Sequence, residues 1–327
     1  MAAPPRSAPA GDRPPAVPLA RIENAVSIVL LIGMALLPLL EIVGRRVWGT
    51  GVPGSNALVQ HATLWIGCLG GAIAARDGRL LSMGRFADRF PQPYREVLNC
   101  FSGAVSTALT VALAWSGFEL VRAEWADRHD VVPFLPLWVA ESVIPAGFLL
   151  IAWRIVRRVS PGWPGRAATV AAAAAGAVFL ASDLILLSAP FAAAIVALAA
   201  AVALGAPLFV ALGGLAVLLF RHADVPLASI SAEIYRLVVS PTLPTIPLFA
   251  FAGYLLTVGN VSRRLVRFFR SIVGWKPGGI AVVTVLVCTI ITTITGASGV
   301  TIVARGGILL PALLGERYPS SSRRACR

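Results

Sequence analysis

Charged side chains are scarce in this chain. Only 13% of its 327 residues are Asp, Glu, Lys or Arg, and 57% are hydrophobic, whereas a soluble domain carries about 25% charged residues. A water-soluble fold of this composition would lack the charges to coat its surface, but a lipid bilayer solvates an apolar exterior. The composition therefore argues against a soluble enzyme and predicts an integral membrane protein of several spans.

Lysine is almost absent, and closely spaced cysteine pairs and catalytic motifs are missing. Lys276 is the only lysine, so the net charge of +13 comes from arginine, which lies in short loops between apolar runs and does not indicate a nucleic-acid partner. The four cysteines show no CxxC spacing, so neither a zinc site nor a disulfide framework is indicated. The absence of HExxH, Walker, GxSxG and GxGxxG motifs disfavours an intramembrane enzyme. No tightly bound cofactor is expected.

The apolar runs predict the fold class. A transmembrane helix needs about 20 apolar residues, and the clear candidates are 22–43, 57–75, 97–121, 134–153, 167–188 and 191–220. Two further runs, 241–258 and 279–314, are interrupted by proline or glycine. We therefore predict an all-α fold, a polytopic transmembrane helix bundle of about six clear spans with interrupted or re-entrant helices near the C-terminus. Residues 80–90 suit an interfacial helix, with a polar loop as the alternative.

The arginines predict the orientation of the spans. Three, two, five, two and four arginines occur in successive connectors, which are the tail through Arg21, 44–56, 76–96, 122–132 and 154–166. Because cytoplasmic loops are rich in arginine, we expect the N-terminus and the third and fifth connectors in the cytoplasm, and 189–190 outside. The basic segment 259–276 is also expected inside, which leaves open whether 241–258 crosses or re-enters.

Hydroxyls and glycines concentrate at one depth of the last apolar run. They are Thr293, Thr295, Gly296, Ser298, Gly299 and Thr301. Glycine lets a helix break, and a broken helix frees backbone groups that bind ions and carboxylates, while hydroxyl oxygens suit a hard cation such as Na⁺. We predict a substrate- or ion-binding site here, with Thr295 and Ser298 as candidate Na⁺ ligands. A polar helix interface is the alternative.

Four residues in the first half are candidates for contacts between helices. Gly67 and Gly71 form a GxxxG pair, which allows two helices to approach closely. Glu141 lies inside a predicted span and is expected to make an interhelical polar contact, because an isolated carboxylate is costly in lipid. His61 is expected to face other helices.

The order of these features resembles the tripartite ATP-independent periplasmic (TRAP) transporters. Residues 21–158 resemble the small, DctQ-like subunit, in LWIGCLGGAIAARDGRL (64–80) and LPLWVAESVIPAGFLLIAWRIVRR (135–158). Residues 191–318 resemble the start of the large, DctM-like subunit, in PTIPLFAFAGYLL (244–256) and TGASGVTIVARGGILLPALL (295–314). The ending SSSRRACR departs from the family pattern.

The resemblance implies four segments along the chain. They are a disordered Pro/Ala-rich tail (1–20), a four-helix small-subunit-like domain (21–158), a linker with one extra transmembrane helix (159–190) and an N-terminal fragment of a large-permease-like domain (191–327). The large subunit is therefore expected to be truncated in this chain.

The resemblance also implies a function. The chain would be a component of a secondary active transporter in the bacterial inner membrane, with a cytoplasmic N-terminus. A periplasmic binding protein would deliver an organic acid, such as a C4-dicarboxylate, and Na⁺ would be the coupling ion. The truncated chain is expected to be inactive alone. The alternative is a membrane scaffold or assembly protein without transport activity.

Overall fold

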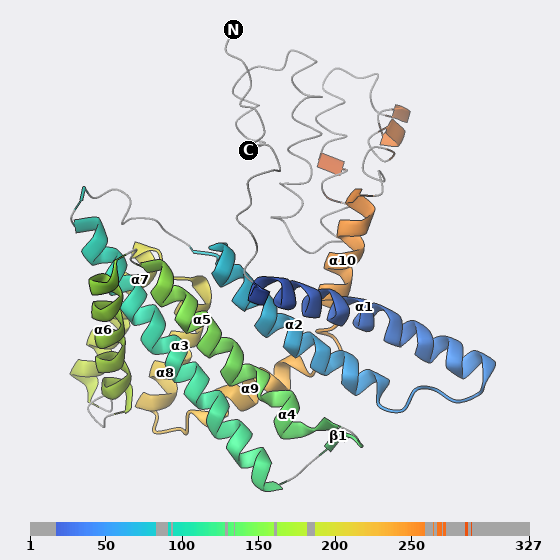
Figure 1. Ribbon diagram of the computed structural model, residues 1–327, viewed down its shortest axis with the longest axis horizontal. Coiled ribbons are helices and arrows are strands. Elements are labelled where there is room, and N and C mark those ends of the chain that lie inside the picture. Colours follow the sequence, from blue (N-terminus) through green and yellow to red (C-terminus); the bar gives the residue numbers. More distant parts are fainter. Residues whose placement is uncertain are drawn as a thin grey trace. The chain divides into compact units, whose positions relative to one another are not determined.

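The fold is almost entirely helical. The computed structural model describes residues 18–82, 91–92, 94–127, 130–133, 135–159, 162–181 and 187–258, with scattered positions between 264 and 289. Within these residues the only sheet is an antiparallel pair of two short strands, β1 (Asp130–Val132) and β2 (Leu135–Pro136). The predicted all-α class is confirmed (Figure 1).

Four helical segments of the described chain are long and apolar enough to cross a membrane. They are α1 (Pro18–Val47), α2 (Ser55–Asp77), α3 (Tyr94–Asp127) and the joined pair α4 (Leu137–Glu141) and α5 (Val143–Val159). The first three contain the first three predicted runs, and the α4–α5 pair covers most of the fourth, 134–153. The predicted ends are less accurate, because a helix continues through polar residues beyond the hydrocarbon core. Thus Arg154, which the sequence assigns to a loop, lies within α5.

Shorter helices follow these spans. They are α6 (Trp163–Ala181), α7 (Ser188–Leu204), α8 (Leu208–His222), α9 (Ala228–Val238) and α10 (Thr245–Val258). The helix α6 covers most of the predicted linker span at 167–188, of which residues 182–186 lie outside the described chain.

The predicted span at 191–220 is two helices joined by a tight turn. Gly205 ends α7 with a φ of 119° and donates its N–H to the carbonyl of Val202 at 3.1 Å, while Pro207 precedes the first turn of α8. Glycine tolerates this positive φ, and proline has no amide hydrogen to leave unsatisfied at a helix start. The turn therefore ends one helix and begins the next within a few residues.

The two helices α7 and α8 run antiparallel. Leu198 of α7 lies 3.2 Å from the position of a Cβ built on Gly214 of α8, and the rings of Phe191 and His222 stack with centroids 4.0 Å apart. The first turn of α7 therefore meets the last turn of α8. The prediction of one span at 191–220 is wrong, because a short Gly-Ala-Pro break hardly changes the hydropathy of the run.

The helix α3 is central to the first of two compact units. Residues 1–239 form this unit, with α1 to α9, and residues 240–327 form the second, with α10. The helix α3 packs against α5, α6, α7, α8 and α9, and α2 packs against α1 and α5 (Figure 1). Leu109, Leu113, Leu198, Val210 and Val217 are buried in this core. Because lipid is as apolar as these side chains, close packing holds the helices together.

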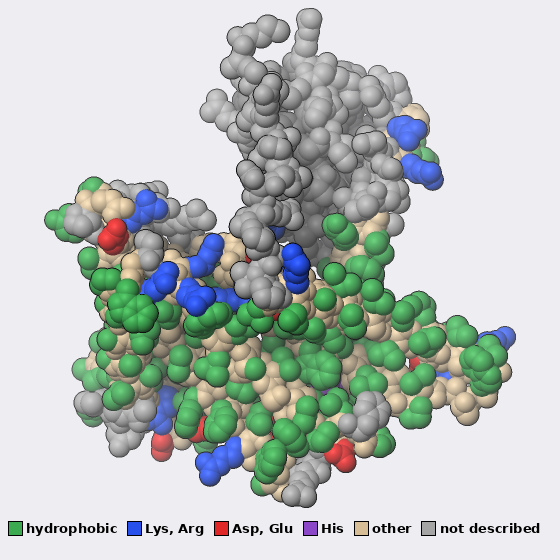
Figure 2. Space-filling model, in the orientation of Figure 1, with side chains coloured by type: hydrophobic (Ala, Val, Ile, Leu, Met, Phe, Trp, Pro, Cys, Tyr) green, Lys and Arg blue, Asp and Glu red, His purple; other side chains and the backbone are tan. Residues whose placement is uncertain are grey.

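Large apolar side chains cover the outside of the first unit. Val29, Val178, Val196 and Leu212 are more than half exposed, and Figure 2 shows a hydrophobic band with basic side chains gathered along one rim. Several exposed tryptophans lie at or near helix ends, as Trp163 does at the start of α6 with 81% exposure. Such a band with aromatic and basic edges is typical of a lipid-facing surface.

Candidate functional site

The predicted binding segment lies outside the described residues. Thr293, Thr295, Gly296, Ser298, Gly299 and Thr301 all belong to this undescribed part. The proposed Na⁺ ligands therefore stay a prediction. Within the described part of the chain, no group of three or more His, Cys, Asp or Glu side chains could hold a metal ion.

The three predicted helix-packing residues have different surroundings. A Cβ built on Gly71 would lie 3.3 Å from Cδ1 of Ile151 in α5, whereas a Cβ on Gly67 would have no neighbour within 4 Å. Glu141, at the end of α4, is 1% exposed, and its Oε2 atom has no hydrogen-bond partner. The close approach of α2 to α5 thus involves Gly71, and Glu141 is a buried carboxyl group with unused acceptor capacity.

Buried hydroxyls join α9 to α3. The Ser116 hydroxyl donates to the carbonyl of Leu227 at 2.5 Å and lies 2.7 Å from the Ser231 hydroxyl. Because a hydroxyl has one hydrogen, Ser231 is the donor in the second bond, and the Ser231 amide also donates to Ser116 Oγ at 3.2 Å. Both side chains are fully buried. We call this surface, with the adjoining His61–Tyr235 contact, the α9 seam.

A histidine and a tyrosine complete the α9 seam. His61 of α2 is 3% exposed, and its Nδ1 lies 2.7 Å from the carbonyl of Ala57. A carbonyl only accepts, so Nδ1 carries the hydrogen, and in a neutral imidazole Nε2 then accepts from the Tyr235 hydroxyl at 2.9 Å. Burial, followed by the charges of Glu141 and Glu124, raises the pKa of Tyr235 to about 12. Tyr235 therefore stays a neutral donor at physiological pH, and the prediction that His61 faces other helices is confirmed.

A buried ion-pair cluster joins α1, α2 and α5. Glu23 is 5% exposed and pairs with Arg154, which is 6% exposed. Arg154 Nη1 also donates to the carbonyl of Ala72 at 2.5 Å, and Arg76 Nη1 donates to Glu23 Oε2 at 2.9 Å. The arginine pattern of the sequence assigns Arg154 to a loop, and it does not single out Glu23. The relevant signal is an acidic residue at the start of an apolar run, since such a charge needs a partner.

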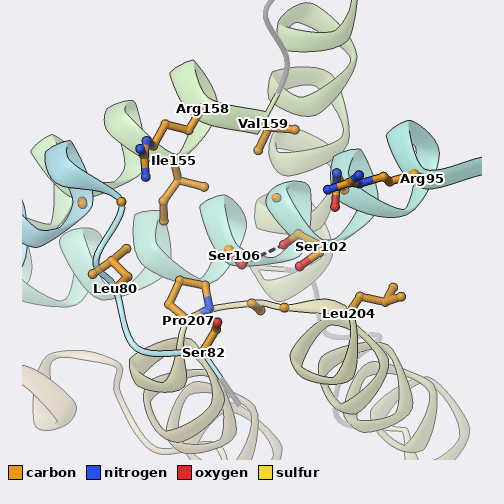
Figure 3. A pocket seen from close by; sticks show the side chains of 16 residues that line it. Leu80, Ser82, Arg95, Ser102, Ser106, Ile155, Arg158, Val159, Leu204 and Pro207 are labelled. Atoms are coloured by element: carbon orange, nitrogen blue, oxygen red, sulfur yellow. Dashed lines mark hydrogen bonds between the residues drawn. The ribbon is translucent and has the colours of Figure 1, made fainter. Parts of the chain in front are cut away.

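A polar cavity lies where several helices end. Its volume is about 350 Å³, and it is lined by the end of α2, the start of α3, the end of α5 and the α7–α8 turn (Figure 3). The turn is tied to the segment after α2, because the Leu208 amide donates to the carbonyl of Leu81 at 2.7 Å and Ser82 forms a β-bridge with Pro207. This cavity, like the α9 seam, joins the first half of the chain to the α7–α9 region.

Two family models match the chain one after the other. Residues 34–165 match the DctQ component of the tripartite ATP-independent periplasmic transporters, and residues 195–326 match the DctM component. The boundary between the matches falls on α6 and the start of α7. The α9 seam and the cavity therefore connect the DctQ-like and DctM-like regions.

Curated relatives give the same assignment. The isethionate TRAP transporter permease protein DctMQ of Oleidesulfovibrio alaskensis is 24% identical over 273 residues, covering 81% of this chain and 42% of the relative. The C4-dicarboxylate TRAP transporter large permease proteins DctM of Rhodobacter capsulatus and Vibrio cholerae are 32% and 33% identical, each over 35% of this chain and 26% of the relative. The chain thus spans less than half the length of these relatives. It belongs to the tripartite ATP-independent periplasmic transporter family and carries that family's DctQ and DctM regions in tandem in one polypeptide.

Proposed function

We propose that this chain is the DctQ-like part and a DctM-like part of a Na⁺-coupled uptake system for an organic acid in the bacterial inner membrane. A periplasmic binding protein would deliver the substrate, and C4-dicarboxylates are the leading substrate class, because two of the DctM relatives are named for them. The observation that carries the proposal is the tandem match combined with the packing of both regions into one unit.

The packing supports a scaffold role for the first unit. Buried hydrogen bonds at the α9 seam and the ion pairs of Glu23 with Arg76 and Arg154 hold α1, α2, α3, α5 and α9 in fixed positions. An elevator-like mechanism needs such a rigid body, against which a transport domain moves around the bound substrate. The predicted binding segment at 293–301 would belong to that moving part.

The α7–α8 turn supports a topology in which the run 241–258 crosses the membrane. With the N-terminus in the cytoplasm, α7 would begin outside, and α8 would bring the chain back to the same side because the two helices are antiparallel. The helix α9 contacts Ser116 and His61, in the halves of α3 and α2 that would face outside. One crossing at 241–258 would then deliver the arginines of 259–276 to the cytoplasm, in agreement with the positive-inside rule.

The proposal is tested by transport in proteoliposomes. Three preparations are compared: the chain alone, the chain with a cognate periplasmic binding protein, and both together with a DctM polypeptide that supplies the regions this chain does not match. We expect succinate uptake only in the third, because the chain spans 26% of the length of its DctM relatives. Replacing the Na⁺ gradient by an equal K⁺ gradient should abolish the uptake.

The other outcomes have distinct meanings. Uptake by the chain alone would show that the DctM regions outside the match are dispensable. Uptake that persists in K⁺ would reject Na⁺ coupling. A stable complex with the DctM polypeptide but no uptake of any tested carboxylate would favour the scaffold or assembly alternative.

A further inference from the structure

The polar cavity between the two regions has the composition of an anion site. Its lining holds two arginines, one asparagine and three serines, and none of its 16 residues is acidic. The arginines are Arg95 from the start of α3 and Arg158 from the end of α5, and Figure 3 shows them on opposite sides of the cavity. Positive charge from two helices, with amide and hydroxyl groups between, is the usual setting for a phosphate.

The hydroxyls at the cavity floor are already engaged. Ser106 donates to the carbonyl of Ser102 at 2.7 Å, and Ser102 donates to the carbonyl of Ala201 at 3.1 Å. These bonds fix the floor, and the cationic side chains in the cavity lining are those of Arg95 and Arg158. A ligand that these groups would recognise is negatively charged.

Close approach to a glycine positions Arg158 at the cavity edge. Gly78 ends α2 with a φ of 66°, and a Cβ built on it would collide with Arg158 Nη1. The guanidinium therefore lies directly against the glycine backbone, in space that any other residue would fill. Among the described residues, no carboxylate forms an ion pair with Arg158, in contrast to Arg76 and Arg154.

In the membrane orientation proposed above, the cavity would lie near the level of the lipid headgroups. It is bounded by the ends of membrane-spanning helices, where Asp77 and Val159 are the last residues of α2 and α5. At the same end of the membrane, the exposed Trp153 ring lies under the Arg157 guanidinium, 4.0 Å from the ring centroid. Tryptophan and arginine together mark the interface between the bilayer and water.

Apolar side chains line the rest of the cavity. Leu80, Ile155, Val159, Leu204 and Pro207 surround the polar groups. A free phosphate ion would not use these surfaces, whereas the glycerol and first acyl carbons of a phospholipid would. Basic pockets between transmembrane helices on the cytoplasmic side are a known setting for phospholipid headgroups.

We propose that this cavity binds the phosphate group of an anionic phospholipid, with Arg95 and Arg158 as its cationic ligands. The lipid would join the ends of α2, α3 and α5 to the α7–α8 turn, and so would strengthen the contact between the DctQ-like and DctM-like regions. The site requires only residues of the first compact unit.

The test is lipid binding to the purified full chain, measured by native mass spectrometry and by thermal stability. Phosphatidylglycerol, phosphatidylcholine and inorganic phosphate are compared as probes. We expect phosphatidylglycerol to bind and to raise the melting temperature. Arg95→Gln and Arg158→Gln should each weaken this binding about fivefold. Arg122→Gln, which removes the same charge from an exposed site near the other end of α3, should not weaken it.

Three results would overturn the proposal. The first is that Arg122→Gln weakens phosphatidylglycerol binding as much as the two cavity variants do. The second is that phosphatidylcholine binds as tightly as phosphatidylglycerol. The third is that inorganic phosphate raises the melting temperature as much as phosphatidylglycerol does, which would assign the site to a free anion. If an arginine variant does not fold, Ser82→Trp provides a second route, because it fills the cavity mouth and keeps both charges. Ser82→Trp should lose the bound phosphatidylglycerol, and unchanged binding in this variant would place the lipid elsewhere.

Discussion

At the scale of single residues, the first unit depends on a few buried polar groups. Glu23 is the common partner of Arg76 and Arg154, so it serves two cations from two helices. Removal of one member of a buried ion pair costs about 3–5 kcal/mol because the other charge is left uncompensated, whereas removal of both costs much less. The cluster is therefore asymmetric, since Glu23 pairs with two arginines, whereas Arg154 pairs with a single carboxylate.

The first prediction uses this asymmetry. Glu23→Leu should lower the free energy of unfolding by about 3–5 kcal/mol, and adding Arg154→Met should restore part of the loss, because the buried guanidinium is then gone. Thermal unfolding in detergent or nanodiscs measures both. Glu233→Leu is the control, because its ion pair with Arg236 is exposed to solvent and contributes little to stability. A double variant as unstable as the sum of its single changes would refute the cluster.

The second prediction separates the two glycines of the GxxxG pair. Gly71→Leu should destabilise the chain by about 1–3 kcal/mol, because its side chain would overpack against Ile151 in α5. Gly67→Leu is the matched control, since a Cβ there meets nothing within 4 Å. Equal losses of melting temperature in both variants would show that α2 does not approach α5 at Gly71.

At the scale of elements, the sequence predicts long helices well and short breaks poorly. The first four spans follow from uninterrupted apolar runs, which have few alternatives to a helix in lipid. The break at Gly205 and Pro207 is only a few residues long, and a hydropathy window averages over it. The end of α5 was also missed, because Arg154 has the hydropathy of a loop residue but is neutralised by Glu23 within the fold.

The third prediction concerns the α7–α8 turn. Single cysteines replacing Ala189, Asp224 and Gly165 are introduced into a variant without its native cysteines and labelled with a membrane-impermeant thiol reagent in intact cells. The cysteines at 189 and 224 should both be labelled, because α7 and α8 are antiparallel and both positions would face outside, and the cysteine at 165 should be labelled only after the membrane is permeabilised. If the cysteines at 189 and 224 proved to lie on opposite sides of the membrane, 191–220 would be one continuous span.

At the scale of the whole molecule, the sequence predicted the two regions but not how they are joined. The DctQ-like and DctM-like stretches were visible in their order and spacing, whereas the α9 seam depends on pairs such as Ser116 with Ser231 and His61 with Tyr235, which are more than a hundred residues apart. Such contacts leave no local pattern, because each partner alone is an ordinary polar residue in an apolar helix. The predicted binding residues at 293–301 remain a prediction.

The DctQ-like region and α7 to α9 of the DctM-like region form one body across the α9 seam. The direct measurement is a disulfide between Ser116→Cys and Ser231→Cys, in a variant without native cysteines and with a protease site inserted between α6 and α7. The serine hydroxyls lie 2.7 Å apart, so oxidation and cleavage should leave both fragments in one band on a non-reducing gel. The control combines Ser116→Cys with Leu212→Cys. Leu212 is an exposed residue of α8, so this pair should not cross-link. If the two fragments of the oxidised Ser116→Cys/Ser231→Cys variant separate on the gel, the two regions are not joined at the α9 seam.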